Sequence, residues 1–85
     1  MTKSKDAIVA EVIEILRQLK AGGSAPIAPQ TLILTDLGVD SLKMIELMDT
    51  LAAKYGVDFA APPQSLDDLR SPETIAAALV RARDG

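Results

Sequence analysis

The sequence contains no cysteine, no histidine and no tryptophan, and Tyr55 and Phe59 are its only aromatic residues. Without cysteine the chain can form no disulfide and no thiolate metal site, and it has no thiol nucleophile of its own. Without histidine it lacks the commonest metal ligand and the usual general base near neutral pH. We therefore expect no metal site and no independent catalytic activity in these 85 residues.

Long apolar runs are missing as well. No stretch of about 18 apolar residues is present, and that is the length needed to cross a bilayer. Lys3 and Lys5 lie near the N-terminus, but no compact apolar block with a small-residue cleavage site follows them. These absences predict a cytoplasmic protein that does not bind membranes.

The composition favours helices. Apolar residues make up 48% of the chain, and almost all of them are Leu, Ile, Val, Ala and Met, whereas strands favour aromatic and β-branched residues. A chain of 85 residues can form one core that hides roughly 60% of the unfolded chain's surface. We expect a single domain over residues 1–85, with its core in about residues 4–83, and a monomer.

The formal net charge is −3, and it is concentrated in one part of the chain. The window 36–50 has four acidic residues and one lysine, so its charge of −3 equals that of the whole chain. A surface of this sign repels nucleic acid and anionic lipid and favours basic protein surfaces. The other interpretation is an ordinary solvated helix face. The charged residues of the window are Asp36, Asp40, Lys43, Glu46 and Asp49.

The first helix is predicted over about residues 4–21, because apolar residues recur there at spacings of three and four. The pair Gly22-Gly23 ends it. Residues 24–35 contain two prolines and show no sustained period, which indicates a long connection. Residues 32–34 inside it are apolar, and since no partner strand is evident we expect a loop held to the core by its leucines. The apolar residues of the helix are Ile8, Val9, Val12, Ile13, Leu16 and Leu19.

A second helix is predicted over residues 40–55, with the Asp40 carboxylate capping the free backbone N–H groups at its start. Gly56 supplies a left-handed stop, and Val57 is placed for the accompanying apolar contact. The stretch 60–63, Ala-Ala-Pro-Pro, then breaks any regular structure.

Two further helix starts follow. Ser65 and Asp68 predict a capped single turn. The run Ser71-Pro72-Glu73 combines a cap, a proline at the first helical position and an acid in the first turn. The sequence therefore predicts an all-α fold, a small four-helix bundle with three main helices, one short helix and a long first loop. The apolar stripe of the last helix contains Ile75, Ala78, Leu79 and Ala82.

The second helix has two apolar stripes. Helical spacing turns one of them toward the core. It contains Met44, Leu47, Met48, Leu51 and Tyr55. The other stripe mixes apolar and acidic residues, and a partner surface with an apolar dent and a basic rim would fit it. It contains Leu42, Ile45, Glu46 and Asp49. The alternative is that Leu42 and Ile45 are only the flank of a wide core stripe.

Ser41 lies at the start of this helix, where a serine is ordinarily only a capping or first-turn residue. The position also favours an anion, because free N–H groups and the positive end of the helix dipole would stabilise a phosphodiester on the hydroxyl. No histidine or lysine stands directly beside Ser41 as a base, so self-activation as a nucleophile is not indicated. Ser41 is therefore interpreted as a substrate for another enzyme.

At these residues the sequence resembles a known family. The run from Asp36 to Leu42, followed by Ile45-Glu46-Leu47, is similar to the modification signature of the acyl carrier protein family. The resemblance extends over roughly residues 4–81.

The resemblance implies a prosthetic group and a set of partners. A phosphopantetheinyl transferase would move 4′-phosphopantetheine from coenzyme A to Ser41, and Asp40 would help to present the serine. The thiol of the group would hold an acyl or aminoacyl cargo as a thioester. The partners would be a loading enzyme, either an acyltransferase or an adenylating enzyme, and a ketosynthase or other acyl-transferring enzyme. The residues expected to meet them are Leu42, Ile45, Glu46 and Asp49.

The sequence departs from the housekeeping fatty-acid carriers of this family, which resemble one another in a strongly acidic second helix. Here the matching stretch 51–54 reads Leu-Ala-Ala-Lys, and Lys43 is basic near the attachment site. Asp49 stands where such carriers often have an apolar contact residue. These differences favour a carrier for polyketide or antibiotic biosynthesis. The alternatives are an aminoacyl or peptidyl carrier, a fatty-acid synthesis carrier, or an unmodified helical protein-interaction module.

Overall fold

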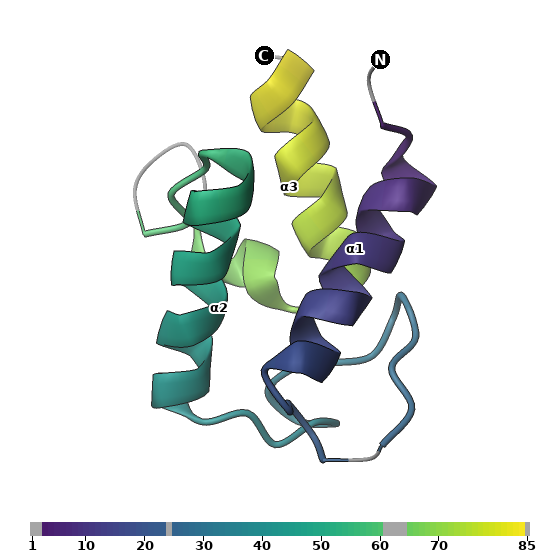
Figure 1. Ribbon diagram of the computed structural model, residues 1–85, viewed down its shortest axis with the longest axis vertical. Helices are drawn as coiled ribbons and strands as arrows, with labels where there is room; N and C mark the ends of the chain where they lie inside the picture. Colours follow the sequence, from purple (N-terminus) through teal and green to yellow (C-terminus); the bar gives the residue numbers. More distant parts are fainter. Residues whose placement is uncertain (1–2, 24, 61–64, 85) are drawn as a thin grey trace.

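The computed structural model describes residues 3–23, 25–60 and 65–84. These residues form three α-helices, α1 (Lys5–Gln18), α2 (Ser41–Tyr55) and α3 (Pro72–Asp84), and a 3-10 helix, η1 (Leu66–Leu69), without a strand (Figure 1). The predicted all-α fold, with three main helices, a short helix and a long first connection, is confirmed. Residues 61–63 of the predicted breaker lie outside the described residues. Within the described ranges, no helix is long and apolar enough to cross a membrane.

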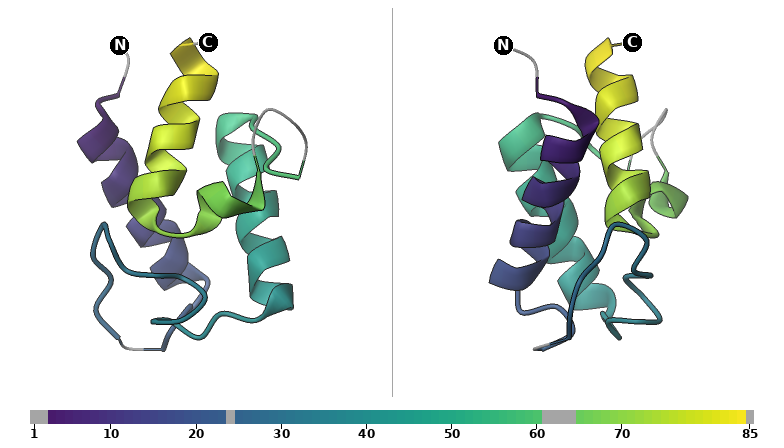
Figure 2. Two further views of the ribbon diagram at one scale, coloured as in Figure 1. Left: turned by 180° about the vertical axis from the view of Figure 1, so that it is seen from behind. Right: turned by 90° about the vertical axis from the view of Figure 1, so that its right-hand side faces the viewer.

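α1 contacts both of the other α-helices. α1 packs most extensively on α3 and less on α2, while η1 packs on α3. The two ends of the described chain meet, because Arg83 Nη1 donates a hydrogen bond of 2.6 Å to the carbonyl oxygen of Lys3. The connection between α1 and α2 covers the opposite end of the bundle in every view (Figures 1 and 2). The start of α2 therefore lies far from the termini.

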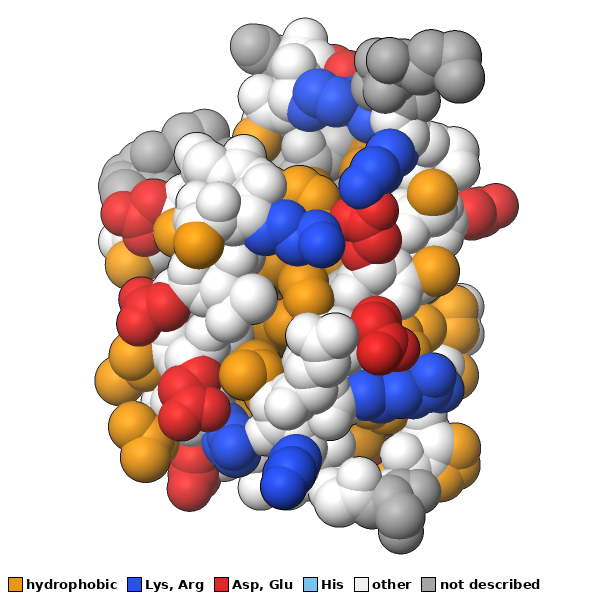
Figure 3. Space-filling model, viewed as in Figure 1, with side chains coloured by type: hydrophobic (Ala, Val, Ile, Leu, Met, Phe, Trp, Pro, Cys, Tyr) orange, Lys and Arg blue, Asp and Glu red, His pale blue; other side chains and the backbone are white. Residues whose placement is uncertain are grey.

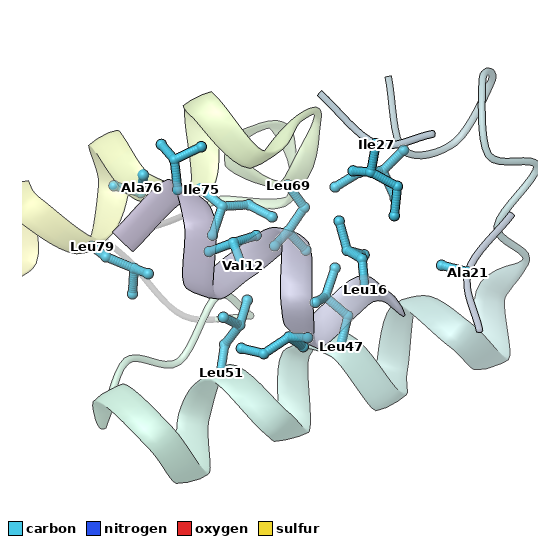
Figure 4. Packing of buried hydrophobic residues seen from close by; sticks show 14 of the residues in the cluster. Val12, Leu16, Ala21, Ile27, Leu47, Leu51, Leu69, Ile75, Ala76 and Leu79 are labelled. Carbon is cyan, nitrogen blue, oxygen red and sulfur yellow. The ribbon is translucent and has the colours of Figure 1, made fainter. Parts of the chain in front are cut away.

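One hydrophobic cluster fills the space between the helices. Figure 4 shows Val12 and Leu16 of α1 in its middle, with Leu47 and Leu51 of α2 on one side and Ile75 of α3 on the other. All five side chains are buried, and each stabilises the fold by about 1.5–3 kcal/mol relative to an exposed side chain. Burial of the predicted inner stripes of the three helices is thus the main force that holds the bundle together.

The end of α1 differs from the sequence prediction. The predicted helix ran to residue 21 and ended at Gly22-Gly23, but α1 ends at Gln18. The backbone turns at Lys20, which adopts the left-handed conformation with φ of 60°. The glycine pair is therefore not the helix stop.

Two backbone hydrogen bonds complete this turn. The Lys20 N–H donates to the Arg17 carbonyl and the Ala21 N–H donates to the Leu16 carbonyl, both at 3.0 Å. This is the Schellman pattern, in which a left-handed residue follows the helix and an apolar contact closes the turn. Buried Ala21 supplies that contact. Glycine is favoured at residue 22 for another reason, since its φ is 75° and a Cβ there would lie 2.7 Å from Leu37 Cδ2 and 3.3 Å from Leu37 Cα.

The apolar run 32–34 is a loop, as predicted, but its leucines do not hold it to the core. Leu32 and Leu34 are 40% and 58% exposed, whereas Ile33 between them is fully buried. The Ile33 N–H donates a hydrogen bond of 2.9 Å to the carbonyl of Arg70, at the end of η1. A second backbone bond of 2.9 Å joins the Glu73 N–H to the Pro29 carbonyl. The loop is thus attached to the corner between η1 and α3.

The predicted helix starts after residue 64 are confirmed. The Ser65 N–H donates to Asp68 Oδ2 at 3.1 Å, as in a capping box. Ser71 caps α3, because its Oγ accepts a hydrogen bond of 3.2 Å from the Thr74 N–H. Pro72 is the first residue of α3, where the missing N–H of a proline costs nothing.

Candidate attachment site at the start of α2

α2 begins with the predicted aspartate cap. Asp40 has extended backbone angles, and its Oδ1 accepts a hydrogen bond of 2.9 Å from the Lys43 N–H. The Asp40 carbonyl accepts the first helical bond, of 3.0 Å, from the Met44 N–H. Ser41 is consequently the first helical residue, and it is exposed. The cap therefore fixes the backbone that carries the Ser41 hydroxyl at the surface.

The environment of Ser41 fits a phosphodiester on its hydroxyl. The N–H groups of Ser41 and Leu42 belong to the first turn, where a helix has no carbonyl to accept them, so an anion is favoured. The Asp40 carboxylate is engaged in the cap, and the Lys43 ammonium lies 3.4 Å from Glu46 Oε2. Neither group is bonded to the Ser41 hydroxyl. The interpretation of Ser41 as a substrate for another enzyme stays a prediction.

The loop before α2 positions Ser41 by alternating buried and exposed residues. Leu37 and Val39 are buried in the core cluster, whereas Asp36 and Asp40 are exposed. Gly38, between Leu37 and Val39, has φ of 63°, a left-handed conformation that glycine adopts without strain. Burial of two side chains therefore anchors the loop immediately before the helix.

Three hydrogen bonds close this loop on itself. The Asp36 N–H donates to the Leu32 carbonyl at 2.8 Å, and Asp36 Oδ2 accepts a bond of 3.0 Å from the Leu32 N–H. The Val39 N–H donates to the Ile33 carbonyl at 3.4 Å. These bonds bring the run 32–34 next to the residues that directly precede Ser41.

The outer stripe of α2 lies at the surface. Leu42 and Ile45 are 65% and 50% exposed, and Asp49 is exposed as well. Glu46 is half-buried and pairs with Lys43. The alternative that Leu42 and Ile45 flank a wide core stripe is therefore wrong. In Figure 3, apolar and acidic side chains gather over α2 along the left edge of the molecule.

The inner stripe of α2 faces the core, as predicted. Leu47 and Leu51 are fully buried, and Met44, Met48 and Tyr55 are partly buried against the cluster. The two stripes thus divide α2 into a side that stabilises the fold and a side that is free for contact. The second half of the outer side has little to offer an apolar partner, since it presents the exposed residues Ala52, Ala53 and Lys54.

A polar cluster holds the far end of α2 against α1. The Tyr55 hydroxyl and the Lys3 ammonium both donate hydrogen bonds to the Glu11 carboxylate. These two bonds lower the pKa of Glu11, with the Lys3 bond having the larger effect. Burial raises the pKa of Tyr55, and the bond to Glu11 raises it further. The cluster lies at the end of α2 opposite Ser41, so its role is structural.

Sequence reasoning missed two exposed residues near Ser41, namely Leu32 and Leu34. A signal was present, because three successive apolar residues in a loop cannot all turn inward at once. Their order of burial depends on the bond between Ile33 and Arg70, two residues far apart in the sequence.

Comparison with known proteins shows to which family the chain belongs. A family model described as the phosphopantetheine attachment site matches residues 6–79, which include α2 and the loop before it. The chain belongs to the acyl carrier protein family. The prosthetic group of this family is phosphopantetheine, and its members carry acyl groups. The predicted membership of this family is thereby confirmed.

Individual acyl carrier proteins are similar over most of the chain. The acyl carrier protein of Thermobifida fusca is 28% identical over 75 residues, which cover 88% of this chain and 92% of that protein. The meromycolate extension acyl carrier protein of Mycolicibacterium aurum is 31% identical over 71 residues, covering 84% of this chain and 71% of that protein. The protein of the same name from Mycobacterium leprae is 31% identical over 71 residues, and the matched part is 60% of its length.

Proposed function

We propose that Ser41 carries the phosphopantetheine group, and that the chain holds an acyl intermediate on it for delivery to partner enzymes. The observation that carries this proposal is the exposed Ser41 as first residue of α2, with its backbone fixed by the Asp40 cap. The first-turn N–H groups favour a phosphodiester there. When bound, the group supplies a thiol that holds an acyl chain as a thioester, chemistry that a chain without cysteine lacks.

The attachment step needs a transferase and coenzyme A. The Ser41 oxygen attacks the phosphorus atom next to the pantetheine part of coenzyme A and forms a new O–P bond. The P–O bond within the pyrophosphate breaks, and adenosine 3′,5′-bisphosphate leaves with its electron pair. The hydroxyl proton passes to a base of the transferase, because the Asp40 carboxylate caps α2 and the Lys43 ammonium pairs with Glu46.

The outer stripe of α2 is proposed to contact the partners. Leu42 and Ile45 offer exposed apolar surface beside Ser41, and Glu46 and Asp49 add negative charge to it. A transferase, a loading enzyme or a ketosynthase with an apolar dent and a basic rim would complement this surface. In this proposal the chain itself catalyses no step.

Intact mass spectrometry tests the site. The chain is incubated with coenzyme A and a promiscuous phosphopantetheinyl transferase, and we expect a mass gain of one phosphopantetheine. Ser41→Ala should abolish the gain, while the matched control Ser65→Ala, an exposed cap at η1, should keep it. A gain that persists in Ser41→Ala would contradict the site. An unmodified wild-type chain would contradict the function and favour a helical interaction module without a prosthetic group.

We further propose a role in polyketide-type biosynthesis. The proposal is supported by the second half of the outer side of α2, where Ala52, Ala53 and Lys54 leave no acidic surface. A second candidate is a role in chain extension of the kind that the name of the mycobacterial relatives states.

The cargo distinguishes these pathways. The chain is purified from its native cells, and the acyl group is released from the thioester with hydroxylamine and identified by accurate mass. A cargo rich in keto or hydroxyl oxygen would support a polyketide-type pathway, and a long cargo poor in oxygen would support chain extension. A cargo that contains amino nitrogen would contradict both and indicate an aminoacyl carrier.

A further inference from the structure

The exposed apolar residues of this protein are concentrated on both sides of Ser41. Among the residues that the structure describes, five large apolar side chains are exposed, and four of them flank the serine. Leu42 and Ile45 follow it on α2, while Leu32 and Leu34 precede it in the loop. The fifth, Leu66, lies on η1. Exposed apolar side chains that gather in one region mark an interaction site.

Leu34 is held close to Ser41 by the closed loop. The bond from the Val39 N–H to the Ile33 carbonyl joins the peptide group just before Leu34 to a point two residues before Ser41. Since two residues span at most about 7 Å, the Leu34 backbone lies on the order of 10 Å from that of Ser41. Ile33 is also bonded to Arg70, so the position of Leu34 does not depend on its own side chain.

The surface around Leu34 has a negative charge. Asp36 and Asp49 are exposed and form no ion pair with a lysine or arginine among residues 3–23, 25–60 and 65–84. Among the described residues, Leu34 and Leu42 are the most exposed large apolar side chains of the loop and of α2, respectively. Asp36 follows Leu34 by two residues in the loop, and Asp49 shares the outer stripe of α2 with Leu42. A partner that covers them needs an apolar surface with basic residues around it.

We infer that Leu34 is a docking contact for the phosphopantetheinyl transferase, in addition to Leu42 next to Ser41. The inference rests on the proposed attachment at Ser41. Enzymes that act on the cargo meet it at the far end of the arm. The transferase, by contrast, must bring a phosphorus atom to the Ser41 oxygen itself. It therefore covers the surface on both sides of the serine, including the loop.

Modification kinetics test this contact. Initial rates of phosphopantetheine transfer are measured by intact mass against the concentration of the chain. Leu34→Ser and Leu34→Lys should raise KM about tenfold or more with kcat unchanged, because a docking contact contributes equally to ground-state and transition-state binding. Leu34→Met should stay near wild type. Leu66→Ser, which removes a leucine of similar exposure from η1, should also stay near wild type.

The outcomes separate this inference from the proposed function. Thermal unfolding monitored by circular dichroism should give wild-type midpoints for all four variants, since Leu34 and Leu66 are exposed. A modified wild type together with wild-type KM in both Leu34→Ser and Leu34→Lys overturns the docking contact alone. An equal rise in KM for Leu66→Ser overturns it as well. A wild-type chain that gains no mass overturns both the contact and the attachment site.

Discussion

α1 and α2 are nearly equal in length, with 14 and 15 residues, yet they use their apolar residues differently. α1 buries five side chains and packs extensively on α3. α2 buries only Leu47 and Leu51, and it exposes Leu42 and Ile45. The large apolar residues of α1 therefore stabilise the fold, whereas two of those on α2, Leu42 and Ile45, contribute surface for contact.

This difference places stability and recognition on separate elements. The core between α1 and α3 does not include Ser41, and the surface around Ser41 contains few of the residues that hold the bundle together. Substitutions on α1 should accordingly change the free energy of unfolding, whereas substitutions on the outer stripe of α2 should change the rate of phosphopantetheine transfer.

The largest expected effect is on stability and comes from α1. Leu16→Ala removes a fully buried side chain and should lower the free energy of unfolding by about 3 kcal/mol. Leu42→Ala on α2 removes the same atoms from an exposed position and should change it by less than about 0.5 kcal/mol. Urea unfolding measures both. Equal losses in the two variants would contradict the division between the helices.

A smaller effect is expected on recognition and comes from the outer stripe of α2. Ile45→Ser should leave the free energy of unfolding unchanged and slow phosphopantetheine transfer to Ser41 about tenfold at low chain concentration. Ala53→Ser, in the exposed second half of the same helix, is the control and should be transferred at the wild-type rate. A wild-type rate for Ile45→Ser would remove this residue from the contact surface.

The Asp40 cap at the start of α2 should affect both the free energy of unfolding and the rate of phosphopantetheine transfer. Asp40→Ala should lower the free energy of unfolding by about 1 kcal/mol, because the Lys43 N–H loses its acceptor. Asp40→Asn keeps an oxygen that can accept this bond and should retain most of the stability. If Asp40 acts on transfer only through the cap, Asp40→Asn should also be modified at the wild-type rate. A slow but stable Asp40→Asn variant would show that the charge itself is recognised.

The stabilisation from the bond between Glu11 of α1 and Tyr55 at the end of α2 should depend on pH. The pKa of Glu11 is lowered in the folded chain, so its stabilisation is present above its ordinary pKa of 4.5 and is lost as pH falls through the lower folded value. Glu11→Gln should therefore be less stable than wild type at pH 7, by less than about 1 kcal/mol because the side chain is partly exposed. This difference should shrink as pH falls below 4.5. Urea unfolding at pH 7 and pH 3 checks it, and a difference of the same size at both pH values would contradict it.

The smallest expected effect concerns the ends of the two helices. The turns that follow the two helices each contain one residue in the left-handed conformation, Lys20 after α1 and Gly56 after α2. Lys20→Gly should raise the free energy of unfolding by about 0.5 kcal/mol, because glycine adopts this conformation without strain. Gly56→Ala should lower it, since nothing crowds the added Cβ and only the backbone strain remains. Thermal melts of both variants compare the two stops directly, and a destabilised Lys20→Gly would contradict the assignment of strain to Lys20.

Elements with local signals could be predicted from the sequence. Asp40, Gly56 and the pair Ser71-Pro72 act within one helical turn of their own position, so the bounds of α2 and the start of α3 agreed with prediction. The end of α1 did not, because Lys20 takes a conformation that only tertiary packing around buried Ala21 selects.

The site was only partly predictable for the same reason. Asp40, Ser41 and the outer stripe of α2 follow from a short motif and from helical spacing. The exposure of Leu34 does not, since it depends on which of three adjacent apolar residues is buried. The buried residue, Ile33, is the one whose N–H bonds to the Arg70 carbonyl, a contact that no local pattern encodes.

The bonds that attach the loop to the corner of η1 and α3 have a consequence for variation. They join the N–H groups of Ile33 and Glu73 to carbonyl oxygens, so they use only main-chain atoms. Any amino acid except proline can supply such an N–H group. Apart from Asp36, whose Oδ2 accepts a bond from the Leu32 N–H, exposed side chains of the loop such as Leu34 can therefore be exchanged, by evolution or by design, while the serine keeps its place. A carrier built in this way can acquire a new set of partners without having to find a new fold.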